Sequence, residues 1–238
     1  MLLPIWALAF MKYRFPVALT LLIGGILLTF GIGIEWSWLF WLPGLLLTLA
    51  HLFVGTSATA SQLLQMGDVE GAEKMLNTTI NPNWLISVFQ ANFFAIKGMI
   101  AMTKNDPAAA EVSMRMAAEL GGNSAAESAG MLLSLGMAQM QQQKFKESDG
   151  NIKRAYDMGS LPEQEQGVAL FYLTQLSLNK RDITSAKSYY AKLKASKNLH
   201  PDLAKHILEL DKIMKQSAQL GNSTMHVRQQ QNMHQKRR

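Results

Sequence analysis

The sequence contains no cysteine, which excludes disulfide bonds, thiolate metal sites and cysteine nucleophiles. It also lacks a phosphate-binding glycine loop and the HExxH and GxSxG motifs, and no pair of carboxylates stands out. The carboxylates fall mostly at turns and helix starts, where they cap helices or meet the helix dipole. We therefore expect a protein that is not an enzyme, with no cofactor, no metal ion and no small-molecule substrate.

Charge is missing from two apolar runs near the N-terminus. Residues 15–34 carry none, and residues 36–55 carry none apart from His51. A helix of about 20 residues spans a hydrocarbon core of roughly 30 Å. The alternative is a pair of buried core helices, but helices of this kind normally show a polar face, which is missing here. The sequence thus predicts that residues 1–55 form a two-span transmembrane helical hairpin, with spans at about 15–34 and 36–55.

The flanking charges predict an orientation for this hairpin. Lys12 and Arg14 precede the first run, and Glu35 is the only charge in the short loop between the runs. The positive-inside rule then places both termini in the cytoplasm. We expect an integral membrane protein, of the bacterial inner membrane. Because only Gly55 weakens the helical pattern after the second run, we also expect this span to continue into the next helix.

A repeat of 38 residues follows the apolar runs. Small residues recur in one register at Ala60, Gly98, Gly136 and Thr174, and in a second at Ala72, Ala110, Ser148 and Ala186. Polar turns recur at Asp68, Asp106, Lys144 and Asp182. Repetition at a fixed period predicts stacked helical units. We expect Gly98 and Ala101 of one helix to face Ala110 and Ala117 of the next.

Each unit is predicted to hold two helices, and the complete fold is predicted to be all-α. The helices are expected at 57–66, 69–80, 84–104, 107–120, 124–142, 145–158, 162–179 and 183–197. Residues 199–220 are expected to form a capping segment, with a helix near 202–219, after Pro201, whose polar face ends the stack. Residues 221–238 are polar, glutamine-rich and basic, and we expect them to be disordered.

The repeat resembles the tetratricopeptide repeat over residues 56–198. The resemblance is carried by Leu132, Leu135 and Gly136 followed by Ser148, Ile152 and Ala155, and by Phe94 and Gly98 followed by Ala110, Met114 and Ala117. It implies an α-solenoid of about four helix-turn-helix units. The family period is about 34 residues, so this chain has four more residues per unit. A Sel1-like repeat, whose period is longer, is the second resemblance, although its glycine-rich turn is missing here.

The resemblance implies a concave surface that binds partners. Its lining would include Met99, Met102, Met137, Met140, Phe171, Gln175 and Asn179. Methionine is flexible and suits varied apolar peptides, although these methionines could equally fill the core.

The C-terminal part of the chain is basic. Residues 180–238 carry 13 lysines and arginines against 4 acidic residues. They include a candidate basic contact face formed by Lys187, Lys192, Lys194 and Lys197. A solvated helix face is the alternative. No aromatic platform accompanies these lysines, so we expect no nucleic-acid partner.

These features predict a membrane-anchored scaffold for protein–protein interactions that recruits or assembles partners at the cytoplasmic face of a membrane. Its partners would be other proteins and the lipid bilayer. The alternative is an accessory subunit of a larger integral membrane complex, because glycines in the apolar runs permit close helix contacts in lipid.

Overall fold

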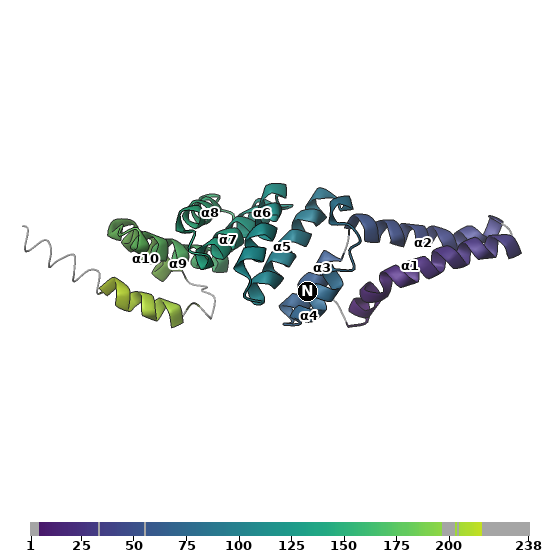
Figure 1. The fold of residues 1–238 in the computed structure, drawn as a ribbon, viewed down its shortest axis with the longest axis horizontal. Coiled ribbons are helices and arrows are strands. Elements are labelled where there is room, and N and C mark those ends of the chain that lie inside the picture. The colour runs from purple at the N-terminus through teal and green to yellow at the C-terminus, as the bar shows by residue number, and fades with distance from the viewer. Residues whose placement is uncertain (1–4, 33, 55, 197–202, 204, 216–238) are drawn as a thin grey trace, which may run out of the picture.

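The computed structural model describes residues 5–32, 34–54, 56–196, 203 and 205–215. All regular structure in these ranges is helical, which confirms the predicted all-α class. Figure 1 shows an elongated molecule: a two-helix arm at one end, a stack of helix pairs, and a further helix near the other end. The fold is therefore solenoid-like.

The arm consists of α1 (Ile5–Ile32) and α2 (Ile34–Val54), which pack against each other towards the hairpin end of the arm. Two glycines permit this approach. A Cβ on Gly25 would lie 2.5 Å from the backbone nitrogen of Trp41, and one on Gly44 would lie 2.6 Å from that of Leu22. The Thr29 hydroxyl also donates to Ser37 Oγ at 3.0 Å. The two helix backbones can therefore approach each other closely, because these glycines have no Cβ at the contact.

The membrane prediction requires a correction. In the described part of the chain, no helix combines the length and the apolar character needed to cross a membrane. On this finding the predicted two-span transmembrane hairpin and the integral-membrane location are wrong. The helix bounds differ from the predicted spans, since α1 begins at Ile5 rather than near residue 15. Near its C-terminal end α2 packs on the first repeat, because His51 is buried and its Nε2 lies 3.2 Å from the Thr78 carbonyl oxygen.

The predicted continuous helix from the second apolar run into the repeats is also wrong. Helix α2 ends at Val54, and α3 (Ser57–Gln65) begins three residues later. The buried Thr56 lies at this junction, where its hydroxyl donates to the Met75 carbonyl at 2.7 Å. The arm is therefore joined to the first repeat by a short break between α2 and α3, where a side-chain hydrogen bond contacts α4.

The remaining helices form the predicted pairs. They are α3 with α4 (Val69–Leu76), α5 (Ser87–Thr103) with α6 (Pro107–Leu120), α7 (Ala125–Gln141) with α8 (Phe145–Asp157), and α9 (Glu163–Asn179) with α10 (Ile183–Ala195). The first helices of the last three pairs begin at 87, 125 and 163, and the second helices at 107, 145 and 183. Both series confirm the 38-residue period.

Two boundaries of the repeat helices differ from the prediction by three residues or more. The helix expected at 69–80 ends at Leu76, and the helix expected at 84–104 begins at Ser87, after a short 3-10 turn, η1 (Pro82–Trp84). Leu85 and Ile86 have extended backbones between the two elements.

The turn inside each pair has one recurrent geometry. The residue before the cap has a left-handed backbone in all four units: Gly67 (φ 82°), Asn105 (62°), Gln143 (60°) and Arg181 (59°). At the next position the side chains of Asp68, Asp106 and Asp182 accept a hydrogen bond from the backbone three residues later. Such a cap satisfies an amide that the helix itself leaves unpaired. Lys144 departs from this pattern and makes no cap.

Close contact within pairs explains the recurrent small residues. A Cβ on Gly98 would lie 2.8 Å from two side-chain atoms of Met114, and one on Gly136 would lie 2.4 Å from Ile152 Cγ1. The predicted approach of Gly98 to the next helix is thus confirmed, with Met114 as its nearest neighbour. Ala110 and Ala117 are fully buried, as expected for residues at a helix contact.

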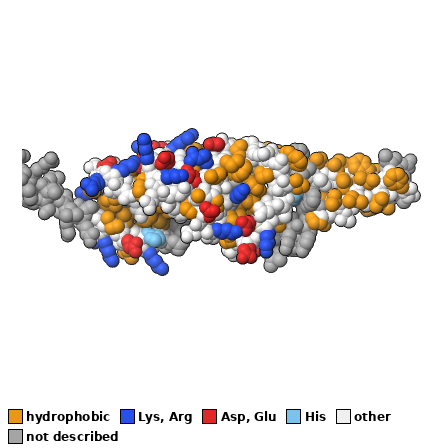
Figure 2. All heavy atoms as spheres, viewed as in Figure 1, with side chains coloured by type: hydrophobic (Ala, Val, Ile, Leu, Met, Phe, Trp, Pro, Cys, Tyr) orange, Lys and Arg blue, Asp and Glu red, His pale blue; other side chains and the backbone are white. Residues whose placement is uncertain are grey.

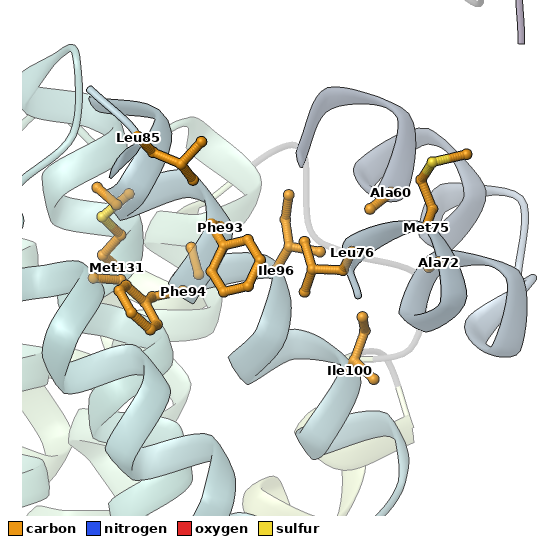
Figure 3. Close-up of a cluster of buried hydrophobic side chains, with 13 residues drawn as sticks. Ala60, Ala72, Met75, Leu76, Leu85, Phe93, Phe94, Ile96, Ile100 and Met131 are labelled. Atoms are coloured by element: carbon orange, nitrogen blue, oxygen red, sulfur yellow. The ribbon is translucent and has the colours of Figure 1, made fainter. Parts of the chain in front are cut away.

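Consecutive pairs are joined by apolar clusters along the stack. The first cluster is built mainly from α3, α4 and α5, and Figure 3 shows Phe93, Ile96 and Ile100 beside Leu76. Two further clusters follow along α7–α9 and α9–α10. The expected capping helix is present at residues 205–215, with Leu210 and Met214 buried in the last cluster. The predicted disordered tail, 221–238, lies outside the described residues.

Polar contacts join the same neighbours. Lys104 Nζ lies 2.5 Å from Glu73 Oε2, and Lys180 Nζ lies 2.5 Å from Asp149 Oδ2. In the unit between them, Gln142 takes the position of the lysines and donates to Glu111 at 2.9 Å. Each of these contacts connects the end of a first helix to the second helix of the preceding unit.

Candidate functional site

A groove lies along the first helices of the units. It has a volume of about 640 Å³ and is lined mainly by α3, α5 and α7, with the start of α9 at one end. We call this the first-helix groove. Its lining repeats with the 38-residue period, since one register contributes Ser61, Met99 and Met137 and another contributes Phe89, Glu127 and Glu165. The solenoid geometry therefore places equivalent positions of successive units side by side.

The groove is apolar with an acidic end. Met99 is 44% exposed, and Phe89 and Met137 are half-buried. Glu127 and Glu165 are the charged side chains among the described lining residues, which include no lysine or arginine. Asn92 and Ser134 add polar groups that can bond a peptide backbone.

The two carboxylates differ in their environment. Glu127 is exposed and accepts a hydrogen bond from the Asn123 backbone at 2.6 Å. Glu165 is half-buried, and burial raises the pKa of its carboxyl above 4.5. Among the described residues, Glu165 has no hydrogen-bond or ion-pair partner. Its Oε2 lies 3.3 Å from where a Cβ of Gly130 would stand, so the carboxylate reaches from α9 towards α7.

The predicted lining residues are only partly brought together. Met99 and Met137 line the groove, whereas the other five do not. Met102, Met140 and Gln175 are half-buried, Asn179 is exposed at the end of α9, and Phe171 is 6% exposed in the last apolar cluster. Phe171 is absent from the groove because the C-terminal helix covers it, with the His206 ring 5.9 Å from its own.

The predicted basic face is partly engaged within the chain. Lys192 Nζ lies 5.6 Å from the centroid of the Tyr156 ring, and Lys194 Nζ lies 5.5 Å from that of Tyr190. Lys194 also lies 3.6 Å from Asp211 Oδ1 on the C-terminal helix. Lys187 is exposed, and Lys197 lies outside the described residues. Lys194 therefore helps to hold the C-terminal helix, and Lys192 contacts a tyrosine of α8.

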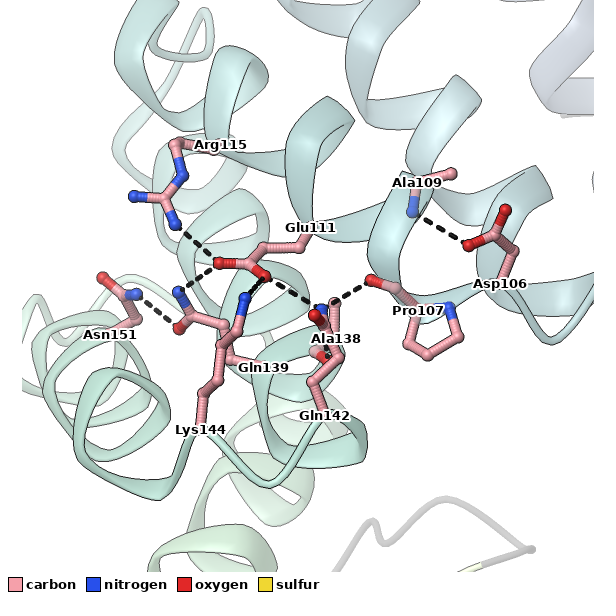
Figure 4. A network of polar contacts seen from close by, with 10 residues as sticks. All are labelled: Asp106, Pro107, Ala109, Glu111, Arg115, Ala138, Gln139, Gln142, Lys144 and Asn151. Atoms are coloured by element: carbon pink, nitrogen blue, oxygen red, sulfur yellow. Dashed lines mark hydrogen bonds and ion pairs between the residues drawn. The ribbon is translucent and has the colours of Figure 1, made fainter.

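The densest polar cluster of the described residues surrounds Glu111 (Figure 4). This side chain is 7% exposed and contacts Arg115 Nη2 at 2.6 Å and Lys144 Nζ at 2.5 Å. It also accepts from Gln139 at 3.3 Å and Gln142 at 2.9 Å. Burial alone would raise the pKa of Glu111, but these donors outweigh it and lower the pKa from 4.5 to about 2.

This network joins the second unit to the third, and we interpret it as structural. Its carboxylate is saturated by donors from α6, α7 and the start of α8, and a carboxylate with a lowered pKa and no free lone pair is a poor proton acceptor at neutral pH. No group of three or more potential metal ligands occurs among the described side chains. The first-helix groove is consequently the stronger site candidate.

Sequence reasoning missed Glu165 and the acidic end of the groove. The signal was present in the repeat register, because Glu127 and Glu165 are 38 residues apart, as are Met99 and Met137. Aligning every column of the repeat, and not only the small residues, would have placed these four side chains on one surface.

No family model matches the chain. No curated protein matches it either. Among solved structures, a match is the crystal structure of BtubC (BKLC) from P. vanneervenii, at 13% sequence identity and a TM-score of 0.48, over 93% of this chain and 92% of that chain. A match at this score carries no argument about this protein.

Proposed function

We propose that the protein is an interaction scaffold whose first-helix groove binds an apolar segment of another protein. The observation that carries the proposal is the groove itself, an apolar hollow of about 640 Å³ with a 44% exposed methionine on its wall. Exposed apolar surface that is concave and rimmed by polar groups is typical of binding sites. The resemblance to tetratricopeptide repeats is consistent with this role.

The arm supports a second candidate, an accessory subunit of a larger complex. Leu27 is 65% exposed and Phe30 is 87% exposed, and Figure 2 shows apolar side chains over much of the arm's visible surface. Charged side chains instead gather over the repeats in the same view. A large contiguous apolar surface marks a place where another molecule packs.

Peptide selection on the purified full chain tests the scaffold function. We expect a random peptide library to yield sequences rich in Leu, Met or Phe. Met99→Glu should weaken their binding about tenfold or more, because a charge would be buried against apolar side chains. Met116→Glu is the matched control, since Met116 is 39% exposed on α6, outside the groove. No enrichment, or equal loss in both variants, would contradict groove binding.

Native electrophoresis of the chain from its own cells tests the second candidate. Leu27→Ser with Phe30→Ser should shift the chain from a large complex to its free size, because the exposed apolar contact is removed. Wild-type chain that already migrates at its free size would argue against the subunit role.

A further inference from the structure

The groove ends at the fourth unit. Ser57, Ala95 and Leu133 line the groove at one repeat position, and Phe171 is the equivalent residue of the fourth unit. Phe171 does not face an open groove, because the C-terminal helix packs there through Leu203, Leu210 and Met214. Two of these contacts, Leu210 and Met214, are four residues apart and so share one face of that helix.

The groove itself is open along the second and third units. Its wall there includes Phe89, Met99 and Met137, of which Met99 is 44% exposed. An amphipathic helix lying in an apolar groove is a recurrent mode of peptide recognition. The apolar wall of the groove, with its exposed methionine, suits this mode of recognition.

Charge sets a second requirement on the occupant. Glu165 is half-buried at the end of the groove, and no described side chain compensates its carboxylate. Leaving a charge partly buried without a partner costs free energy. A cation from a bound segment would supply the missing donor, and Glu127 nearby adds to the attraction.

We propose that the first-helix groove binds an amphipathic helix of a partner protein, with apolar side chains against Met99 and Met137 and a lysine or arginine at Glu165. This inference rests on the proposed scaffold function and specifies its ligand. Burial of Glu165 is then a cost of the free protein that binding relieves. Glu165 is the residue that selects for a basic helix.

Peptide selection on full-length variants tests the inference. On the wild type, we expect apolar residues at helical spacing (i, i+4, i+7) and one enriched Lys or Arg. On Glu165→Gln, the basic residue should lose its enrichment while the apolar pattern stays. Glu119→Gln, an exposed carboxylate on α6 outside the groove, is the control and should leave both features unchanged. A rise in melting temperature for Glu165→Gln would show that this variant folds.

Affinities of one selected peptide complete the test. Replacing its basic residue with Gln should weaken binding about tenfold on the wild type and less than twofold on Glu165→Gln, as expected for a charge-assisted hydrogen bond. Proline at the peptide's centre should weaken binding about 100-fold, because it disrupts a helix by ~3 kcal/mol.

Three results would overturn the inference. Selected apolar residues that alternate as in a strand would exclude a helical occupant. A basic residue that is equally enriched on Glu165→Gln would exclude the charge contact. A marked gain in peptide affinity on Arg237→Glu with Arg238→Glu would identify the chain's own tail as the occupant. If no peptide is enriched on any variant, the scaffold proposal itself fails.

Discussion

Replacing Lys144 with aspartate should destabilise the protein, although the substitution makes the third unit match the other three. The backbone at Lys144 (φ −79°, ψ 62°) resembles that of the capping residues Asp68 and Asp182. An aspartate there could accept an amide hydrogen bond and contribute about 1 kcal/mol as a cap. By propensity alone, Lys144→Asp would therefore be stabilising.

The Glu111 network reverses that expectation. Lys144 Nζ lies 2.5 Å from a carboxylate that is 7% exposed, while the lysine side chain is 45% exposed. Loss of such a half-buried pair should cost roughly 2 kcal/mol, between the ~0–1 of exposed pairs and the ~3–5 of buried pairs. An aspartate beside Glu111 would add like-charge repulsion. We expect a net loss of about 1–2 kcal/mol.

A second substitution should restore the loss. Position 142 holds Gln where the neighbouring units have Lys104 and Lys180, so the unit has its cation two residues later than they do. Gln142→Lys with Lys144→Asp moves the cation back to the position of its neighbours and adds the cap. The double variant should recover at least about 1 kcal/mol relative to the single variant, because the cation again faces Glu111.

Urea unfolding followed by circular dichroism measures both variants. A change in midpoint with an unchanged slope reports stability alone. Wild-type stability of Lys144→Asp would refute the role of the ion pair. A double variant no more stable than the single variant would refute the proposed exchange of positions.

Three further predictions concern single sites. Gly136→Ala should lower the free energy of unfolding by up to ~2 kcal/mol in the urea assay, because its Cβ would lie 2.4 Å from a buried isoleucine and overpack the contact. Gly150→Ala is the control: it has open space around it and should raise the free energy of unfolding by ~0.5–1 kcal/mol. The depressed pKa of Glu111 contributes stability above pH ~4.5 that is lost as the pH falls towards 2, so Glu111→Gln should be less stable than wild type at pH 7 and nearly equal to it at pH 2. Gly130→Ala should favour the helix yet weaken peptide binding, since the new methyl group would lie 3.3 Å from Glu165 Oε2, and calorimetric titration should separate the two effects.

The repeat architecture could be predicted because its determinants are local and recur. Asp106 with Pro107 marks a helix start in the sequence, and the structure shows this cap accepting from the Ala109 amide at 3.0 Å. Lys144 was placed correctly in the register, but its role was invisible in the sequence. Its partner Glu111 lies 33 residues away, and only the stacking of units brings the two together.

Other features could not be predicted because they depend on how long-range neighbours cover a surface. Phe171 occupies a groove position of the repeat, yet the C-terminal helix buries it. The break between α2 and α3 was likewise hidden, since Gly55 alone, with no proline beside it, is only a weak helix-stop signal. The hydroxyl of Thr56 at this break donates to the carbonyl of Met75, 19 residues away, a contact that local sequence does not reveal. The apolar runs of the arm identified two helices correctly, whereas the inference from apolar composition to membrane spans was wrong.

Equivalent positions of the repeat units fall into two groups, those that build the stack and those that line the groove. Positions at which the units share a conformation or a small side chain, such as the left-handed turn position and the buried small residue, lie at the turns and contacts that build the stack. The groove columns change in type along the stack: Ser61 is followed by Met99 and Met137, and Phe89 by Glu127 and Glu165. A stack requires uniform contacts, but a binding surface needs a particular sequence of apolar and charged groups. The variation across the groove columns therefore agrees with the proposed ligand, a helix that is apolar along most of its length and basic at the end that meets Glu165.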